Sequence, residues 1–198
     1  MSNRAPGRAA AAAVALLLFV AATPRQLAKQ DVEGIRNFTR VDATVACAGA
    51  TSVEAIAELK REGFVSIVNL RQATEPGADI EASRAAAEAA GLNYIHLPFD
   101  SSAPSPEVAT AFLAAVANKA NQPVFVHCGS ASRVGALWLI KRVMKDGWTI
   151  AQATEEAKAI GLRSEKLEAF ALKYLADNDG ERRRAPGLPS FARPRPGA

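Results

Sequence analysis

The chain has 198 residues, of which 49% are hydrophobic and 22% are charged. This composition excludes an extensively disordered protein and is typical of one globular domain with short extensions. The net charge of +4 comes from the two ends of the chain: Arg4 and Arg8 contribute +2, and residues 177–198 contribute another +2. Because the middle of the chain is neutral overall, we expect no nucleic-acid partner.

The first 22 residues resemble a targeting segment. Arg4 and Arg8 precede an uncharged apolar run over residues 9–22, which is shorter than the ~20 residues that cross a bilayer as a helix. Small residues at its end allow cleavage after Ala22. We therefore predict a signal peptide over residues 1–22 and a periplasmic or secreted protein. The alternative is an uncleaved N-terminal anchor, which would be the only contact of the chain with a membrane.

The rest of the chain divides into three parts. Residues 23–35 are predicted to be a linker, and residues 36–176 contain all the regular apolar patterns and form one predicted domain. Residues 177–198 are rich in proline, glycine and arginine without apolar periodicity, so we predict a disordered basic tail.

Histidine and cysteine are rare in the chain. Cys47 and Cys128 are the only cysteines, too few for a disulfide scaffold, although a single bridge between them is an alternative. His96 and His127 do not combine with these cysteines in any metal-ligand spacing. We predict no metal and no cofactor.

Strand and helix patterns alternate along the predicted domain. This alternation predicts an α/β fold with a mainly parallel central sheet of about four or five strands, flanked by helices. Ligands in such folds bind beyond the carboxyl ends of the strands. In chain order the predicted elements are an edge strand or hairpin over 39–47, a helix over 52–62, a strand over 65–70, a helix over 79–90, a strand over 94–97, a helix from 105, a strand over 123–127, and helices over 133–146, 149–160 and from 164 onward.

The segment after the strand 123–127 contains the residues best suited to chemistry. Cys128 directly follows this strand, and Arg133 stands where a helix begins. Backbone N–H groups of a tight loop at a helix N-terminus bind anions and stabilise a thiolate. The arginine adds a planar fork that matches two phosphoryl oxygens. We therefore predict a Cys128 thiolate nucleophile in an anion cradle that Arg133 closes, with four small residues forming the loop: Gly129, Ser130, Ala131 and Ser132.

Two further residues stand near this loop in the predicted fold. His127 has no carboxylate partner visible in the sequence, so we interpret it as a buried residue that orients the loop. Arg71 ends the predicted strand over 65–70 and has two interpretations: it contacts an anion at the active edge, or it is a solvated loop arginine.

The residues from His127 to Gly135 resemble the active-site loop of cysteine-dependent protein tyrosine and dual-specificity phosphatases. Residues 36–176 are similar to a bacterial dual-specificity-phosphatase-like family that is related to domains fused to β-lactamase-fold hydrolases. The matching pieces occur in the same order along the chain: Gly49-Ala50-Thr51-Ser52, Phe64–Arg71, Ala90–Pro98 and His127–Gly135.

This resemblance implies a phosphatase of the tyrosine or dual-specificity type that acts on a phosphorylated protein or a small phosphomonoester. Cys128 would attack phosphorus to form a phosphocysteine, while Arg133 and the loop amides hold the phosphoryl oxygens. The family uses an upstream aspartic acid as general acid, and Asp100 is the best positional match. The alternative is that Asp100 is an ordinary loop or capping carboxylate before Ser101 and Ser102.

The sequence departs from the phosphatase pattern at three positions. Four residues separate Cys128 from Arg133, where the common phosphatase loop has five, and a shorter ring occurs in rhodanese-like sulfurtransferases. Val134 replaces the hydroxyl residue that often follows the arginine, for which Ser130 or Ser132 could substitute, and Ala50 stands where glutamine is expected. Two alternatives therefore remain: a sulfurtransferase with a Cys128 persulfide, and a module that only binds an anion.

Overall fold

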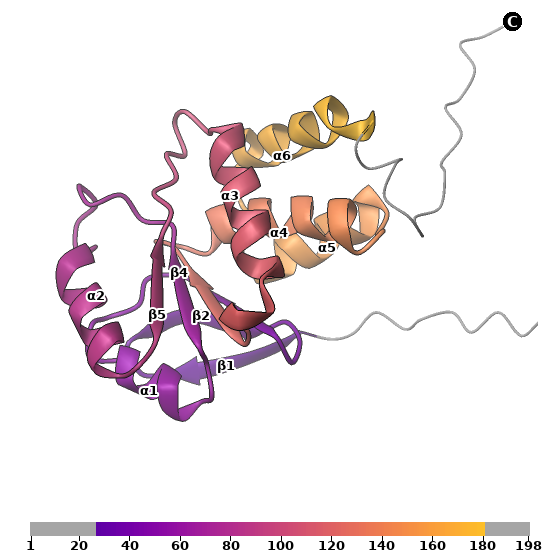
Figure 1. The fold of residues 1–198 in the computed structure, drawn as a ribbon. Coiled ribbons are helices and arrows are strands. Elements are labelled where there is room, and N and C mark those ends of the chain that lie inside the picture. The colour runs from indigo at the N-terminus through magenta and orange to yellow at the C-terminus, as the bar shows by residue number, and fades with distance from the viewer. Residues whose placement is uncertain (1–26, 181–198) are drawn as a thin grey trace, which may run out of the picture.

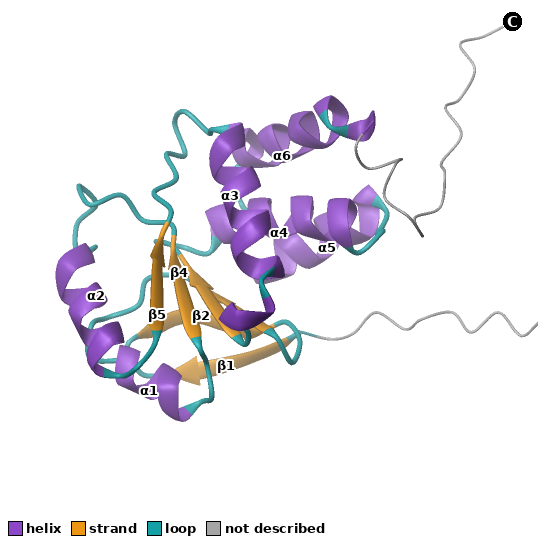
Figure 2. Ribbon diagram, in the orientation of Figure 1, coloured by secondary structure: helices purple, strands orange, loops and turns teal. Residues whose placement is uncertain are grey.

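A computed structural model describes residues 27–180, so the predicted signal peptide and residues 181–198 lie outside the described residues. Within this range the chain forms a central sheet with helices on both of its faces (Figure 2). Strands and helices occur in the order β1 (Ala28–Val32), β2 (Ile35–Arg40), β3 (Val45–Ala48), α1 (Ile56–Arg61), β4 (Ser66–Asn69), α2 (Ile80–Ala89), β5 (Asn93–His96), α3 (Pro106–Ala117), a 3-10 turn (Lys119–Asn121), β6 (Val124–His127), α4 (Ser132–Lys145), α5 (Ile150–Ile160) and α6 (Glu165–Asp177).

The sheet has six strands in the order β1-β2-β3-β6-β4-β5. Strands β3, β6, β4 and β5 are parallel, and β1 and β2 are antiparallel to their neighbours. The prediction of an α/β fold with a central sheet between helices is confirmed. The predicted strand number and the mainly parallel sheet are corrected to six strands in a mixed sheet.

The additional strand lies in a segment that we predicted to be a linker. Within residues 23–35, β1 covers Ala28–Val32 and pairs with β2, with Lys29 opposite Thr39. The sequence of β1 is polar and its residues are mostly exposed, so it lacks the apolar alternation that predicts a strand. Charged residues are common on such exposed edge strands because they discourage pairing with other chains.

Two other predicted boundaries also change. The predicted hairpin over 39–47 consists of β2 and β3, whose register places Thr39 opposite Cys47. The predicted helix from Ser52 begins only at Ile56. Ser52 Oγ accepts a hydrogen bond from the amide of Ala55 at 3.3 Å, so it caps a turn that precedes the helix.

Helices α1 and α2 cover one face of the sheet, and α3 to α6 cover the other (Figure 1). The smaller core under α1 and α2 contains stacked and edge-to-face rings of Phe38, Phe64 and Phe125. The larger core surrounds α4, whose residues from Ser132 to Ile140 are all buried. A helix that is apolar on most sides must be covered on most sides, and α3, α5 and α6 supply this cover.

The N-terminal part of α4 is packed closely against the turn between α5 and α6. A Cβ atom on Gly135 would lie 2.8 Å from the carbonyl oxygen of Ala157 and 3.0 Å from Cβ of Leu162. A Cβ atom on Gly161 would lie 2.7 Å from Cβ of Ala131. These two glycines therefore allow the α5–α6 turn to support the loop in front of α4. None of the helices in residues 27–180 is both long enough and apolar enough to cross a membrane.

Candidate active site

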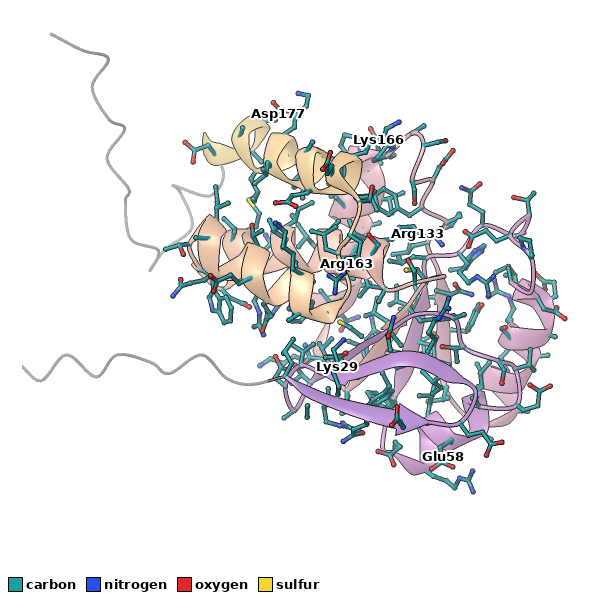
Figure 3. The ribbon with its side chains drawn as sticks, turned by 180° about the vertical axis from the view of Figure 1, so that it is seen from behind. Lys29, Glu58, Arg133, Arg163, Lys166 and Asp177 are labelled. Carbon is teal, nitrogen blue, oxygen red and sulfur yellow. The ribbon has the colours of Figure 1, made fainter. Side chains whose placement is uncertain are left out.

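The loop between β6 and α4 lies at the carboxyl end of the sheet, between the ends of β3 and β4. Cys128 follows β6 directly and has no exposed surface, and Arg133 in the first turn of α4 is 8% exposed. Figure 3 shows Arg133 at the end of the sheet, near the turn that carries Arg163. The structure therefore brings the predicted nucleophile and the predicted anion-binding arginine to one edge, as expected for ligand sites in such sheets.

The carbonyl groups of three successive loop residues are held by donors outside the cradle. The amide of Ala50 donates to the Gly129 oxygen at 3.0 Å, and Asn37 Nδ2 donates to the Ser130 oxygen at 3.3 Å. The amide of Gly135 donates to the Ala131 oxygen at 2.9 Å. Because these hydrogen bonds fix the carbonyl groups, the surrounding elements orient the peptide groups of the loop.

The loop amide groups, by contrast, remain available. Among residues 27–180, no protein acceptor takes a hydrogen bond from the amides of Gly129, Ser130 or Ala131. Ala131 adopts a left-handed conformation with φ of 71°, the kind of backbone that forms anion-binding nests before a helix. The loop can therefore supply several N–H donors to a bound oxyanion.

Ser132 ties the loop to the next pair of helices. Its Oγ accepts hydrogen bonds from the amides of Arg163 at 3.1 Å and Ser164 at 3.3 Å. We predicted that this hydroxyl could replace the one missing after Arg133. In the structure its oxygen is used by the α5–α6 turn, so only its proton is left for a ligand or for the sulfur of Cys128.

Arg133 is fixed by acceptors on one side of its guanidinium group. Nη1 donates to the carbonyl oxygens of Leu70 at 3.2 Å and Phe99 at 3.0 Å. Both terminal nitrogens donate to Glu75, with Nη1 at 2.5 Å from Oε1 and Nη2 at 2.8 Å from Oε2. Within the described residues no oxygen or nitrogen atom accepts a hydrogen bond from Nε, and the Cys128 sulfur lies close to the guanidinium group, so the edge formed by Nε and Nη2 remains for two oxygens of a ligand.

The electrostatics of this pair keep both partners charged. Partial burial raises the pKa of Glu75, but hydrogen bonds from Arg133 and from the amide of Gln72 outweigh burial and lower that pKa to about 2. Burial lowers the pKa of Arg133, but its hydrogen bonds to Glu75 and the nearby sulfur of Cys128 raise that pKa above its ordinary value. Arg133 therefore stays positively charged and Glu75 negatively charged near neutral pH.

Glu75 was not predicted from the sequence. It lies in the loop after β4, four residues beyond Arg71, and the carboxyl end of β4 is adjacent to that of β6. The topology could have pointed to it, because loops that follow neighbouring parallel strands meet at the same edge. The sequence alone did not indicate which of several loop carboxylates pairs with Arg133.

Arg71 lies buried against its own loop. It is buried, and it donates to the carbonyl oxygens of Pro76 at 2.6 Å and Gly77 at 2.7 Å and to Glu75 at 3.4 Å. A solvated arginine is therefore excluded. Each of its three guanidinium nitrogens donates one hydrogen bond within its own loop, so the structure shows a role of Arg71 in holding that loop.

Asp100 follows Phe99, whose carbonyl accepts a hydrogen bond from Arg133, so its backbone lies next to the cradle. Its exposed carboxylate accepts hydrogen bonds from the amide and the hydroxyl of Ser102, both at 2.7 Å. The hydroxyl and then the amide of Ser102 lower the pKa of Asp100. In this conformation the carboxylate caps its own loop.

Cys47 is a buried thiol on the strand beside the nucleophile. It lies on β3 opposite Val126, and both it and Cys128 are free thiols, so the alternative of a disulfide bridge is not supported. Burial raises the pKa of Cys47 well above its ordinary value. Cys47 is therefore a packing residue. Among the described residues, no group of three or more His, Cys, Asp or Glu side chains could hold a metal ion.

His127 is a neutral group at the base of the loop. It is 4% exposed, its ring stacks on Phe125 with 5.6 Å between centroids, and within the described residues its Nδ1 has no hydrogen-bond partner. Burial, and then the charges of Arg71 and Arg133, lower its pKa to about 3. A base this weak does not hold a proton near neutral pH, so the imidazole is uncharged beside the thiol.

This burial predicts a pH-dependent stability. Between pH 6.5 and about 3 the unfolded chain binds a proton on His127 that the folded chain does not, so stability falls on acidification through this window. A single proton contributes about 1.4 kcal/mol per pH unit. Replacing His127 with glutamine should reduce the slope of unfolding free energy against pH, measured by urea denaturation between pH 4 and 7. Equal slopes for the two proteins would contradict the low pKa.

Comparison with known proteins is consistent with this geometry. A sequence model of the phosphatase-like domain of beta-lactamase hydrolase-like proteins matches residues 34–145, more than half of the chain. No curated protein sequence gives a significant match. Among solved structures, TpbA of P. aeruginosa is 22% identical, with 79% of this chain and 94% of that chain covered and a TM-score of 0.60. The catalytic core of the S. cerevisiae phosphatase Siw14 is 21% identical, with 78% and 94% covered and a TM-score of 0.64.

At these identities the solved structures show a shared fold, and the assignment to a family comes from the match over residues 34–145. The matched range contains β2 to β6 and all of α4, and so includes Cys128, Arg133, Glu75 and Asp100. The chain therefore belongs to the phosphatase-like domain family of beta-lactamase hydrolase-like proteins.

Proposed function

We propose that this protein is an exported cysteine-dependent phosphatase of the tyrosine or dual-specificity type. The observation that carries the proposal is the arrangement of hydrogen-bond donors and acceptors in the loop from Cys128 to Arg133. The carbonyl groups of Gly129, Ser130 and Ala131 are held from outside, and the amides of the same residues have no acceptor in the described protein. One edge of the arginine is also free of oxygen acceptors. This arrangement suits the equatorial oxygens of a phosphoryl group around a buried sulfur nucleophile.

The reaction has two steps in this proposal. The thiolate of Cys128 attacks phosphorus, so that an S–P bond forms as the P–O bond to the leaving group breaks. Water then attacks phosphorus, the S–P bond breaks, and phosphate and the thiolate are released. In both steps the loop amides and Arg133 hold the three oxygens whose negative charge would otherwise repel the nucleophile.

We assign Asp100 the role of proton donor to the leaving oxygen, and of proton acceptor from the attacking water in the second step. Its backbone lies beside Arg133 through the Phe99 carbonyl, which supports this role. To act as an acid, Asp100 must exchange its hydrogen bonds with Ser102 for a contact with the leaving group, because those hydrogen bonds favour the ionised form.

Two neighbours indicate the range of substrates that this fold accepts. TpbA has been solved as a cysteine-to-serine variant in complex with phosphotyrosine, and Siw14 is described as a PP-IP phosphatase. We propose a phosphorylated protein or a small phosphomonoester as the substrate class of this chain.

The four-residue loop favours one second candidate, a sulfurtransferase in which Cys128 carries a persulfide. The amides of Gly129, Ser130 and Ala131 could surround a persulfide sulfur as well as a phosphoryl group. The unpaired edge of Arg133 favours the phosphatase, because a terminal sulfur does not need a fork of two donors.

A paired assay separates the two candidates. We expect the wild type to hydrolyse an aryl phosphate and to transfer little sulfur from thiosulfate to cyanide. Cys128→Ser should lose phosphatase activity by more than about 10³-fold, and Arg133→Ala by about 10²–10⁴-fold, because each removes an interaction of the transition state. The control is Cys47→Ala, which changes the other buried cysteine and should retain activity.

The reverse pattern of activities would replace the phosphatase with the sulfurtransferase. Phosphate release that persists in Cys128→Ser would contradict a phosphocysteine. If neither activity is found but vanadate binds tightly, the site is an anion-binding module.

The acid role of Asp100 predicts a dependence on the leaving group. Asp100→Asn should reduce kcat by about 10²–10³-fold for alkyl or phenyl phosphates, whose leaving oxygens need a proton, and much less for nitrophenyl phosphates. The measurement is kcat for a series of esters with leaving groups of increasing acidity. An equal loss for all esters would contradict the acid role and leave Asp100 as a capping residue of its loop.

Export is the part of the proposal that rests on the sequence alone. Expression of the full chain in a bacterial host should give a mature periplasmic protein that begins at Thr23, because the apolar run ends in small residues. Intact-mass spectrometry of the fractionated cells measures this. Full-length protein in the membrane fraction would identify an uncleaved anchor, and full-length protein in the cytoplasm would contradict export.

A further inference from the structure

We infer that Arg71 is a positioning residue for the reaction, which acts through Glu75 to hold the Arg133 guanidinium group in its substrate-binding orientation. The inference rests on the proposed function, since it assigns a role in phosphate-ester turnover. The role goes beyond that function because the side chain of Arg71 is buried and its hydrogen bonds go to its own loop, at Glu75, Pro76 and Gly77.

The backbone of Arg71 is anchored to the sheet. Its amide donates to Oδ1 of Asn69 at 2.9 Å, and its carbonyl oxygen is 2.8 Å from Nε2 of His96. Asn69 and His96 end the neighbouring parallel strands β4 and β5, and Nδ2 of Asn69 donates in turn to the Tyr94 hydroxyl at 2.7 Å. Arg71 therefore begins its loop from a fixed point at the end of the sheet.

The side chain of Arg71 closes the loop that follows it. Nη2 and Nη1 donate to the carbonyl oxygens of Pro76 at 2.6 Å and Gly77 at 2.7 Å, and Nε donates to Oε2 of Glu75 at 3.4 Å. The side chain is 7% exposed, so these acceptors are not replaced by water without cost. One guanidinium group thus joins the two ends of residues 71–77.

Glu75 transmits this constraint to Arg133. Its Oε1 accepts from the amide of Gln72 at 2.8 Å, which fixes the carboxylate from within the loop, and both oxygens then pair with Arg133. The bond from Arg71 to Glu75 is longer than those from Arg133, at 3.4 Å against 2.5 and 2.8 Å. Arg71 therefore acts mainly by fixing the loop carbonyls around Glu75, and less by direct attraction of the carboxylate.

A direct role of Arg71 in binding the substrate does not fit its contacts. Three of its five N–H groups, one on each nitrogen, donate to protein acceptors, and its Nε is paired where that of Arg133 is not. Its remaining direct effect is its charge, which lysine would preserve. Lysine cannot reproduce three donors on separate nitrogens, so Arg71→Lys separates the charge from the positioning role.

The test is a double-mutant cycle on purified protein with an aryl phosphate substrate. Arg71→Met, Arg71→Lys and Glu75→Gln should each reduce kcat/KM about 10- to 100-fold, because misplacement of a binding group by an ångström has effects of this size. In the Glu75→Gln background, the additional change Arg71→Met should lower kcat/KM by less than a further factor of about two, because Arg71 acts through Glu75.

Arg40→Met is the matched control. It removes an arginine that is also paired to a carboxylate, Glu62, at 3.0 Å and at the other end of the sheet, and it should leave kcat/KM unchanged.

Losses that multiply in the double variant would overturn the inference, because they would show that Arg71 acts independently of Glu75. Wild-type activity in Arg71→Lys would also overturn it, since charge alone would then suffice. Both results would leave the proposed phosphatase function intact.

A second measurement does not depend on activity. The Nε–Hε signal of Arg133, identified by its loss in Arg133→Lys, is followed by ¹⁵N NMR during titration with inorganic phosphate. Arg71→Met should shift or broaden this signal in the free protein and weaken phosphate binding about 10-fold, whereas Arg40→Met should do neither. An unchanged Arg133 signal and phosphate affinity in Arg71→Met would overturn the inference. If the wild type hydrolyses no phosphate ester, the proposed function fails, and this signal still decides the role of Arg71.

Discussion

The ion pair between Arg133 and Glu75 is the interaction on which the rest of the site depends. An arginine that closes an anion cradle must be held firmly without losing the donors that bind the ligand. Glu75 meets both needs because its two carboxylate oxygens accept one hydrogen bond from each terminal nitrogen. The edge of the guanidinium group that contains Nε is left for a ligand. The carbonyl groups of Leu70 and Phe99 complete the support and connect the arginine to the loops that follow β4 and β5. One side chain therefore joins three loops at the end of the sheet.

The pair also sets the electrostatic balance of the site. Arg71 and Arg133 carry two positive charges near His127, and Glu75 carries one negative charge because its pKa of about 2 keeps it ionised. His127 adds no charge because burial and the two arginines lower its pKa to about 3. The remaining net positive charge, with the loop amides, favours the binding of an anionic ligand.

The rigidity of the loop has a different source, the packing of the α-helical layer. Helix α4 is buried over most of its length, and the turn between α5 and α6 approaches it closely at Gly135 and Gly161. Two backbone amides of that turn also donate hydrogen bonds to Oγ of Ser132. A four-residue loop can thus keep Ala131 in a left-handed conformation because elements on both sides fix it. The short loop that distinguishes this chain from the common phosphatase pattern is supported by its surroundings.

The sequence by itself determined the α/β class, the order of the elements and the position of Cys128 and Arg133 at the edge of the sheet. These follow from local signals: apolar periodicity, helix boundaries, and small residues between a strand and a helix. Only the tertiary structure decided that β1 joins the sheet, because its polar residues have no pattern of their own and pair through the backbone. It also decided that Glu75 pairs with Arg133 across 58 positions of sequence, and that Arg71 is buried against its own loop. Such pairings depend on which loops meet at the end of the sheet, and this juxtaposition is set by the strand order and leaves no local trace in the sequence.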